Sequence, residues 1–94
     1  MMRESLIEKE LIREVKVRGG MALKFVSPGM SGVPDRLVLI PGGVIAFVEV
    51  KAPRERMRPQ QIKRKRQLEA LGFQVYQLDD IKMIGGMLDE ICAT

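Results

Sequence analysis

The sequence predicts a small α/β domain in which a mixed β-sheet is flanked by helices. The chain has 94 residues, of which 46% are apolar and 30% charged, a composition typical of a folded globular domain. Its apolar residues alternate between helical and strand spacing, and glycines and prolines separate these segments. The predicted order, α-β-β-β-α-β-α, forms layers of helix and sheet within one domain.

The chain is expected to open with an amphipathic helix over residues 4–18, because its apolar residues recur at spacings of three and four. The inward stripe consists of Ile7, Leu11, Ile12 and Val15. Gly19-Gly20 ends this helix, and residues 21–27 read as a short strand. Glu8 falls inside the stripe and needs a partner there. Glu4 also falls within the stripe, but its place in the first turn suits the helix dipole.

Two β-rich runs, 36–40 and 44–50, are joined by Pro41-Gly42-Gly43 and predict a hairpin. A loop of this composition suits a type I turn followed by a left-handed residue. In this register the numbers of paired residues have a constant sum, which places Asp35 directly across from Glu49 on a half-buried face. Two facing carboxylates disfavour each other's ionisation, and a divalent cation with oxygen ligands, Mg²⁺ or Mn²⁺, resolves the conflict.

Lys51 lies two residues beyond Glu49 and therefore points to the same face. Its ammonium is within reach of a phosphoryl oxygen or a water at the metal. The competing interpretation is structural: Asp35 caps the strand entry, and Glu49 with Lys51 forms an ordinary ion pair. A register shift of one residue would also separate the carboxylates.

The second half predicts a helix, a strand and a last helix. Pro59 suits the first position of a helix that runs to Leu71 and ends at Gly72, with Ile62 and Leu68 facing inward alongside Leu71. Residues 73–78 form the next strand. Asp79 is then the expected N-cap of a last helix. The apolar stripe of that helix contains Ile81, Ile84, Leu88 and Ile91, supplemented by Met87. It either packs on the protein's own sheet or serves as a homodimer interface, where Gly85-Gly86 allows close approach.

The net charge is +4, from 16 Lys and Arg against 12 Asp and Glu, and the excess is concentrated between residues 54 and 66. Such a cluster favours contact with nucleic-acid phosphates, although a solvated helix face would look the same. The candidate nucleic-acid-binding residues are Lys24, Arg36, Arg54, Arg56, Arg58, Lys63, Arg64, Lys65 and Arg66.

The chain contains no histidine and a single cysteine, Cys92. This excludes an intrachain disulfide, Cys-pair zinc sites and catalysis by Ser-His-Asp or Cys-His groups. No apolar run approaches the roughly 18 residues that a membrane span needs, so no membrane partner is expected. We expect a cytoplasmic protein of a bacterial or phage-infected cell.

The pattern Pro34-Asp35 followed by Glu49-Val50-Lys51 resembles the PD-(D/E)XK motif of nucleases. The longer strings 32–36 and 47–53, with Glu8 in the opening helix and Pro59-Gln60-Gln61 after the motif, resemble the VRR-NUC branch of that superfamily. The resemblance covers almost the whole chain, so residues 1–94 are expected to form one VRR-NUC domain. Only the stretch 54–58 departs from the pattern, being more basic and poorer in glycine.

The resemblance implies a restriction-endonuclease-like αβββαβ core. It also implies that Asp35, Glu49 and the Val50 carbonyl hold the metal and that Lys51 orients or activates the attacking water. Glu8 would complete the acidic cluster. Gln61 would be the glutamine at the helix start, with Gln60 as the alternative if the helix begins one residue earlier. Stand-alone members of this size resemble homodimeric Holliday-junction resolvases.

These observations predict a metal-dependent DNA endonuclease, acting on branched DNA such as four-way junctions. Three alternatives remain: a nuclease for linear or single-stranded DNA, a non-catalytic nucleic-acid-binding module on the same fold, and a structural or adaptor subunit. The joint presence of Asp35, Glu49 and Lys51 favours an active enzyme over the last two.

Overall fold

The computed structural model describes residues 3–93 and contains a mixed four-stranded sheet with helices on both faces. The elements are α1 (Glu4–Val17), β1 (Met21–Lys24), β2 (Arg36–Ile40), β3 (Val44–Val50), α2 (Pro59–Ala70), β4 (Gln74–Leu78), a 3₁₀ turn η1 (Ile81–Met83) and α3 (Ile84–Cys92). The strand order is β1-β2-β3-β4, antiparallel except for the parallel pair β3 and β4. The α/β fold class expected from the sequence is confirmed.

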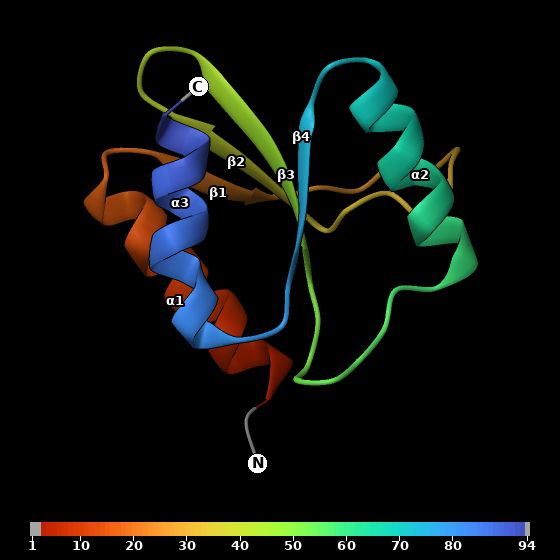
Figure 1. Cartoon of the computed structure of the whole chain (residues 1–94), viewed down its shortest axis with the longest axis horizontal. Helices are drawn as coiled ribbons and strands as arrows, with labels where there is room; N and C mark the ends of the chain where they lie inside the picture. The colour runs from red at the N-terminus through yellow and green to blue at the C-terminus, as the bar shows by residue number, and fades with distance from the viewer. Residues whose placement is uncertain (1–2, 94) are drawn as a thin grey trace.

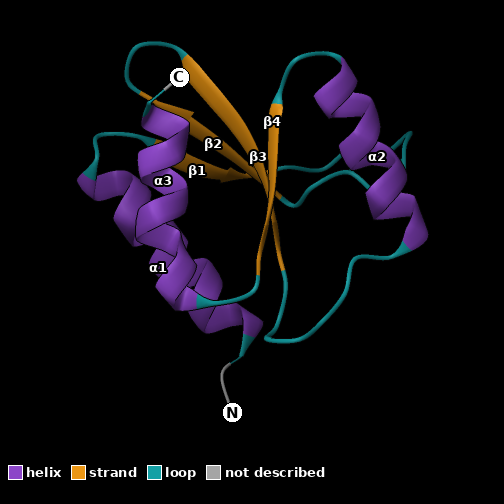
Figure 2. Cartoon of the chain, viewed as in Figure 1, coloured by secondary structure: helices purple, strands orange, loops and turns teal. Residues whose placement is uncertain are grey.

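Helices α1 and α3 lie together on one face of the sheet, and α2 lies on the other (Figure 1, Figure 2). The main core lies between the sheet and the α1/α3 pair. Its buried residues are Ile7, Leu11, Val15, Val38, Ile40, Ala46, Val48, Val50, Leu78, Ile84, Met87, Leu88 and Ile91. Ile12, expected in the inward stripe, is exposed at its edge. No described helix is long and apolar enough to span a bilayer.

The last helix, α3, packs its apolar residues into this core. Ile84, Leu88 and Ile91 are each at most 1% exposed, so the apolar stripe of α3 packs on the protein's own sheet. It is therefore not available as a dimer interface, and of the two interpretations of the stripe only the intramolecular one stands. The helix also begins differently from the prediction. Asp80, rather than Asp79, caps the preceding 3₁₀ turn by accepting a hydrogen bond from the Lys82 N–H at 2.9 Å.

Helix α2 contributes no buried residue, which differs from the inward placement expected for Ile62, Leu68 and Leu71. Ile62 and Leu71 are 38% and 73% exposed, while Leu68 is half-buried. On this face of the sheet Phe47 and its strand partner Val75 are buried outside the main core. The Phe47 ring centroid lies 5.6 Å from that of Phe25 and 5.7 Å from that of Phe73. The polar helix thus covers a smaller satellite core.

Glycine ends both α1 and α2 in the same way. Gly19 has a φ of 83° and Gly72 a φ of 96°, the left-handed conformation that non-glycine residues disfavour. In each case the next residue donates its N–H back into the helix, Gly20 to the Val15 carbonyl and Phe73 to the Leu68 carbonyl. These are Schellman motifs, which fix the direction in which each following strand leaves its helix.

The hairpin register predicted from the loop is confirmed, with Arg36 opposite Val48 and Ile40 opposite Val44. The predicted type I turn is wrong. Gly42 has a φ of 95° and Gly43 a φ of 80°, whereas a type I turn needs a negative φ at its second central residue. Two consecutive glycines permit this turn because neither carries a Cβ. The first strand is also shorter than expected, ending at Lys24.

Candidate active site

Asp35 immediately precedes β2 and reaches across to the end of β3. Its Oδ1 accepts a hydrogen bond from the Val50 N–H at 3.0 Å, and its backbone carbonyl accepts one from the Phe25 N–H at 2.9 Å. The side chain thus continues the hairpin where the backbone ladder stops. Because the N–H and carbonyl of one strand residue point to the same edge, the Val50 carbonyl faces this side as well.

Glu49 and Lys51 lie at the end of β3 and are buried, 4% and 6% exposed. The Lys51 Nζ is 3.3 Å from the Glu49 Oε2. Gln61 on α2 donates from its Nε2 to the same Oε2 at 2.8 Å and accepts the Arg58 N–H with its Oε1, also at 2.8 Å. The structure therefore places Gln61, and not Gln60, against the carboxylate, with its amide orientation fixed by the helix N-terminus.

Burial dominates the electrostatics of both carboxyl groups. It raises the pKa of Asp35, and the Glu8 carboxylate raises it further, against the opposing hydrogen bond from Val50. Burial also raises the pKa of Glu49, followed by repulsion from Asp35, while the hydrogen bond from Lys51 opposes the increase. The two carboxylates therefore lie close enough to repel each other, as expected from the hairpin register.

Glu8 on α1 borders the site but has its own cation. Its Oε1 lies 3.0 Å from the Arg36 Nη2, and Arg36 also donates to the Ala22 carbonyl at 3.3 Å. The Arg36 side chain is 12% exposed, which removes it from the expected nucleic-acid surface. Glu4, which the sequence assigned to the helix dipole, also borders the site. Burial raises the pKa of Glu4, the Asp35 and Glu8 carboxylates raise it further, and Lys51 lowers it. The position of Glu4 in the inward stripe of α1 was the sequence feature that could have placed it near the site.

Glu55 is a neighbour of the site that sequence reasoning missed. Its Oε1 accepts the Ala52 N–H at 3.2 Å, and its carbonyl accepts a hydrogen bond from Gln77 at 3.2 Å. These bonds hold the segment after Lys51 against β4. Within this segment Arg54 has a φ of 69°, a conformation that favours glycine. The stretch 54–58 contains no glycine, so a strained arginine, Arg54, occupies the left-handed position.

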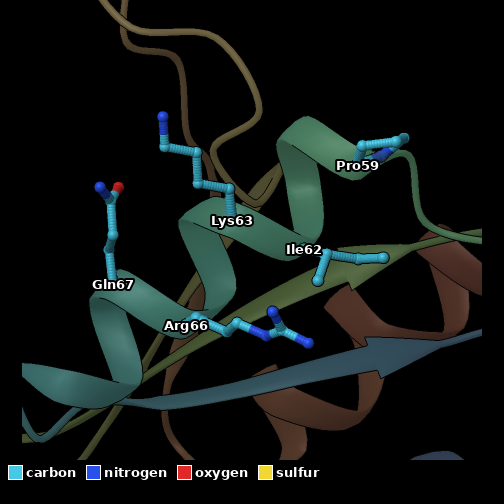
Figure 3. Close-up of a pocket in the computed structure, with 5 residues that line it drawn as sticks. All are labelled: Pro59, Ile62, Lys63, Arg66 and Gln67. Atoms are coloured by element: carbon cyan, nitrogen blue, oxygen red, sulfur yellow. The ribbon is translucent and has the colours of Figure 1, made fainter.

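The predicted basic residues other than Arg36 divide into an exposed group and a group paired with protein acceptors. Lys24, Arg54, Arg56, Arg58, Lys63 and Arg66 are exposed. Lys65 pairs with Glu69 at 3.0 Å, and the Arg64 guanidinium is bound to protein acceptors. Figure 3 shows Lys63 on one turn of α2 and Arg66 with Gln67 on the next, where they line a pocket of about 510 Å³ together with Pro59 and Ile62. The exposed members at 54–58 and on α2 flank Gln61 in the chain.

The donor set fits a hard divalent cation with few protein ligands. Among residues 3–93 no group of three or more Asp, Glu, His or Cys side chains is arranged to hold a metal. Asp35 accepts the Val50 N–H with Oδ1, and Glu49 contacts Gln61 and Lys51 with Oε2, while the Asp35 backbone also bonds to both carboxylates. A buried and a half-buried carboxylate that repel each other, next to a strand carbonyl, suit Mg²⁺ or Mn²⁺, which retain several waters.

No protein-family model matches the chain. A protein named "Putative nuclease p44", from Acyrthosiphon pisum secondary endosymbiont phage 1, is 56% identical over 79 residues, 84% of this chain and 85% of the relative. A solved structure described as "VRR_NUC domain" matches with a TM-score of 0.88 at 29% identity, covering 95% of this chain and 97% of that one. The chain belongs to the VRR_NUC family. In this VRR_NUC protein, Pro34-Asp35 immediately precedes β2. Glu49 and Val50 are the last two residues of β3, and Lys51 follows them.

Proposed function

We propose that this VRR_NUC nuclease is a metal-dependent endonuclease that hydrolyses phosphodiester bonds of DNA. The observation that carries the proposal is the convergence of Asp35, Glu49 and Lys51, all from the β2/β3 hairpin, on a site bordered by the N-terminus of α2. Withdrawing Glu49 fully and Asp35 partly from water beside each other is costly unless the two carboxylates bind a cation. Exposed cations precede and follow Gln61 in the chain, at 54–58 and on α2.

Asp35, Glu49 and the Val50 carbonyl would hold Mg²⁺ or Mn²⁺. When bound, the metal would lower the pKa of a water and stabilise negative charge on the phosphoryl group. Asp35 and Glu49 contribute the negative charge that binds the cation. Lys51, fixed by Glu49, presents an ammonium that stabilises charge developing on a phosphoryl oxygen. Water attacks phosphorus in line, and the bond to the leaving O3′ breaks, which leaves a 5′-phosphate and a 3′-hydroxyl.

Gln61 keeps Glu49 in place for this chemistry. Because its Oε1 accepts the Arg58 N–H, its amide must donate from Nε2 to Glu49. This orientation favours the ionised form of the carboxylate, which is the form that binds a cation. Glu8, paired with Arg36, contributes negative charge at the border of the site.

We further propose branched DNA, such as a four-way junction, as the substrate and a homodimer as the acting form. Resolving a junction takes two cuts related by approximate two-fold symmetry, and a two-fold dimer presents two sites with that symmetry. Exposed apolar side chains near the end of α2, Leu71 and Phe73, together with Val26 and Met30, offer a surface for a second copy. The burial of the α3 stripe excludes that stripe from the interface.

A cleavage panel tests the proposal. Four-way junctions, flaps, single strands and linear duplexes are incubated with the protein and Mg²⁺, Mn²⁺ or a chelator. We expect cleavage only with metal, and products with 5′-phosphates. Asp35→Asn and Glu49→Gln should abolish cleavage but retain DNA binding, because each removes a ligand charge without removing a cation from the surface. Lys51→Ala should lose most of the activity.

Glu10→Gln provides the matched control, since Glu10 is a carboxylate on α1 that pairs with Arg13 outside the site. It should cleave like the wild type. Cleavage by Asp35→Asn at the wild-type rate would contradict the site assignment. DNA binding without cleavage of any substrate, under every metal condition, would favour the non-catalytic binding module.

A further inference from the structure

A polar contact between the loop that leads to Asp35 and the first half of α2 connects two parts of the site. Ser31 donates from its Oγ to the Gln60 Oε1 at 3.0 Å, and its carbonyl accepts a hydrogen bond from the Arg64 Nε at 2.8 Å. The same guanidinium donates from Nη1 to the Gln67 Oε1 at 2.9 Å. Arg64 therefore links the loop to its own helix with two donors of a rigid fork.

Gly32 brings the two backbones into direct contact. Its φ is 81°, and a Cβ at this position would lie 2.6 Å from the Gln60 carbonyl oxygen. A side chain is thus excluded by conformation and by space, and the obstructing atoms are backbone atoms that cannot rotate away. The loop is pressed against the first turn of α2 at this point.

Each side of this contact leads directly to a site residue. On the loop side, Gly32 is followed closely by the fully buried Pro34 and then by Asp35. On the helix side, Gln60 is followed by Gln61, which donates to Glu49. The spacing between loop and helix therefore determines how Asp35 and Gln61 stand relative to Glu49. Helix α2 has no buried residue that would set this spacing by apolar packing.

We propose that Arg64 is a positioning residue, which acts with Gly32 to fix Asp35 and Gln61 around Glu49, and not a phosphate-binding residue. The inference rests on the proposed nuclease function for its kinetic consequence. Its structural basis is independent, because two of the three guanidinium nitrogens of Arg64, Nε and Nη1, are bound to Ser31 and Gln67. This separates Arg64 from the exposed cations Lys63 and Arg66 on the same helix.

Arg64→Lys distinguishes the two roles, because lysine keeps the charge but cannot reach both acceptors with a fork. We expect kcat to fall about 10- to 100-fold, the usual cost of losing a residue that orients a ligand, with KM for DNA and the salt dependence of binding unchanged. Gly32→Ala should show the same kinetic pattern. Arg13→Lys on α1, whose guanidinium also binds two side chains, is the control and should behave like the wild type.

Amide NMR provides a readout that does not depend on activity. The Val50 N–H reports on Asp35, and the Gln61 side-chain amide reports on Glu49. Both resonances should shift in Arg64→Lys and stay in place in Arg13→Lys. Wild-type kcat in Arg64→Lys with both resonances unmoved would overturn the inference, and so would a lower salt slope in Arg64→Gln with unchanged kcat. If the wild type cleaves no DNA, the nuclease proposal fails while the NMR comparison still tests the positioning role.

Discussion

At the scale of single residues, the site combines two buried charges, Glu49 and Lys51, with the half-buried Asp35. Glu49 and Lys51 are both almost fully buried and pair with each other, and Gln61 supplies a further hydrogen bond. A buried ion pair recovers only part of its desolvation cost. Asp35 adds a second carboxylate to the same place, and its repulsion raises the pKa of Glu49 beyond the effect of burial. Such an arrangement lowers the free energy of unfolding, which is common where residues are held for a functional role.

The raised pKa values of Asp35 and Glu49 predict how stability depends on pH without metal. A carboxyl with a folded-state pKa above its unfolded value contributes stability below the unfolded pKa, and this contribution is lost as the pH rises through the folded pKa. Asp35→Asn cannot ionise and keeps the oxygen that accepts the Val50 N–H. We expect it to have a higher melting temperature than the wild type at pH 7, with the difference shrinking toward pH 4.

Calorimetry in the presence of a chelator, from pH 4 to pH 8, measures this effect. Glu10→Gln is a control with the opposite sign, because the hydrogen bond from Arg13 lowers the pKa of Glu10. Its stabilising contribution is present above the unfolded pKa and is lost as the pH falls. A melting temperature of Asp35→Asn below that of the wild type at pH 7 would refute the destabilising role of this carboxylate.

At the scale of elements, α2 differs from the other two helices. It contributes no buried residue, and polar contacts hold it in place: Gln61 with Glu49, Gln60 with Ser31 and Arg64 with the Ser31 carbonyl. A helix fixed by its N-terminal half can present its remaining surface to a ligand. The exposed cations on α2 and on the segment before it form such a surface, continuous in sequence with the site.

Neutralising exposed cations should reduce the salt dependence of DNA binding. Arg66→Gln removes one charge from α2, and Arg54→Gly removes one from the preceding segment while suiting a φ of 69°. Each variant is expected to lower the log–log salt slope by about one for each phosphate that the protein no longer neutralises. Fluorescence anisotropy with a labelled junction at several salt concentrations measures the slope. Arg13→Gln on the opposite helix layer is the control, and unchanged slopes would indicate a solvated surface.

At the scale of the whole molecule, the two faces of the sheet differ in how completely they are covered. Helices α1 and α3 cover one face of the sheet (Figure 1), and each contributes a buried apolar stripe to the main core. On the α2 side, Leu71, Met30 and Phe73 are 73%, 48% and 41% exposed, and Leu71 and Met30 line one pocket. Exposed apolar residues gathered in this way commonly mark interaction surfaces. The proposed dimer should therefore use the α2 side.

Sedimentation at micromolar concentration should detect a dimer of the wild type and a monomer of Leu71→Asp, because burying an unpaired charge in an interface is unfavourable. On a cruciform plasmid the dimer should make paired nicks within one binding event, and the variant should nick singly. Leu6→Asp, a matched change of an exposed leucine on α1, should remain dimeric. A monomeric wild type that nicks singly and cuts linear duplex equally well would refute junction resolution and leave the nuclease proposal intact.

The sequence by itself determined the elements and the pairing within the hairpin. Spacing of apolar residues identified α1, β2, β3 and β4, and Gly19 and Gly72 identified the ends of two helices. The loop length was enough to align Asp35 with the end of β3. These features follow from local rules, because helix period, strand alternation and turn length act over a few residues.

Only the tertiary structure decided which distant side chains meet. It directed Gln61 to Glu49 and Gln60 to Ser31, paired Arg36 with Glu8, and buried the stripe of α3. The charge pattern could not separate Arg64 from Arg66, since both are arginines of one helix. Their difference depends on whether a backbone carbonyl from a remote loop lies within reach, and the packing of that loop at Gly32 sets this distance.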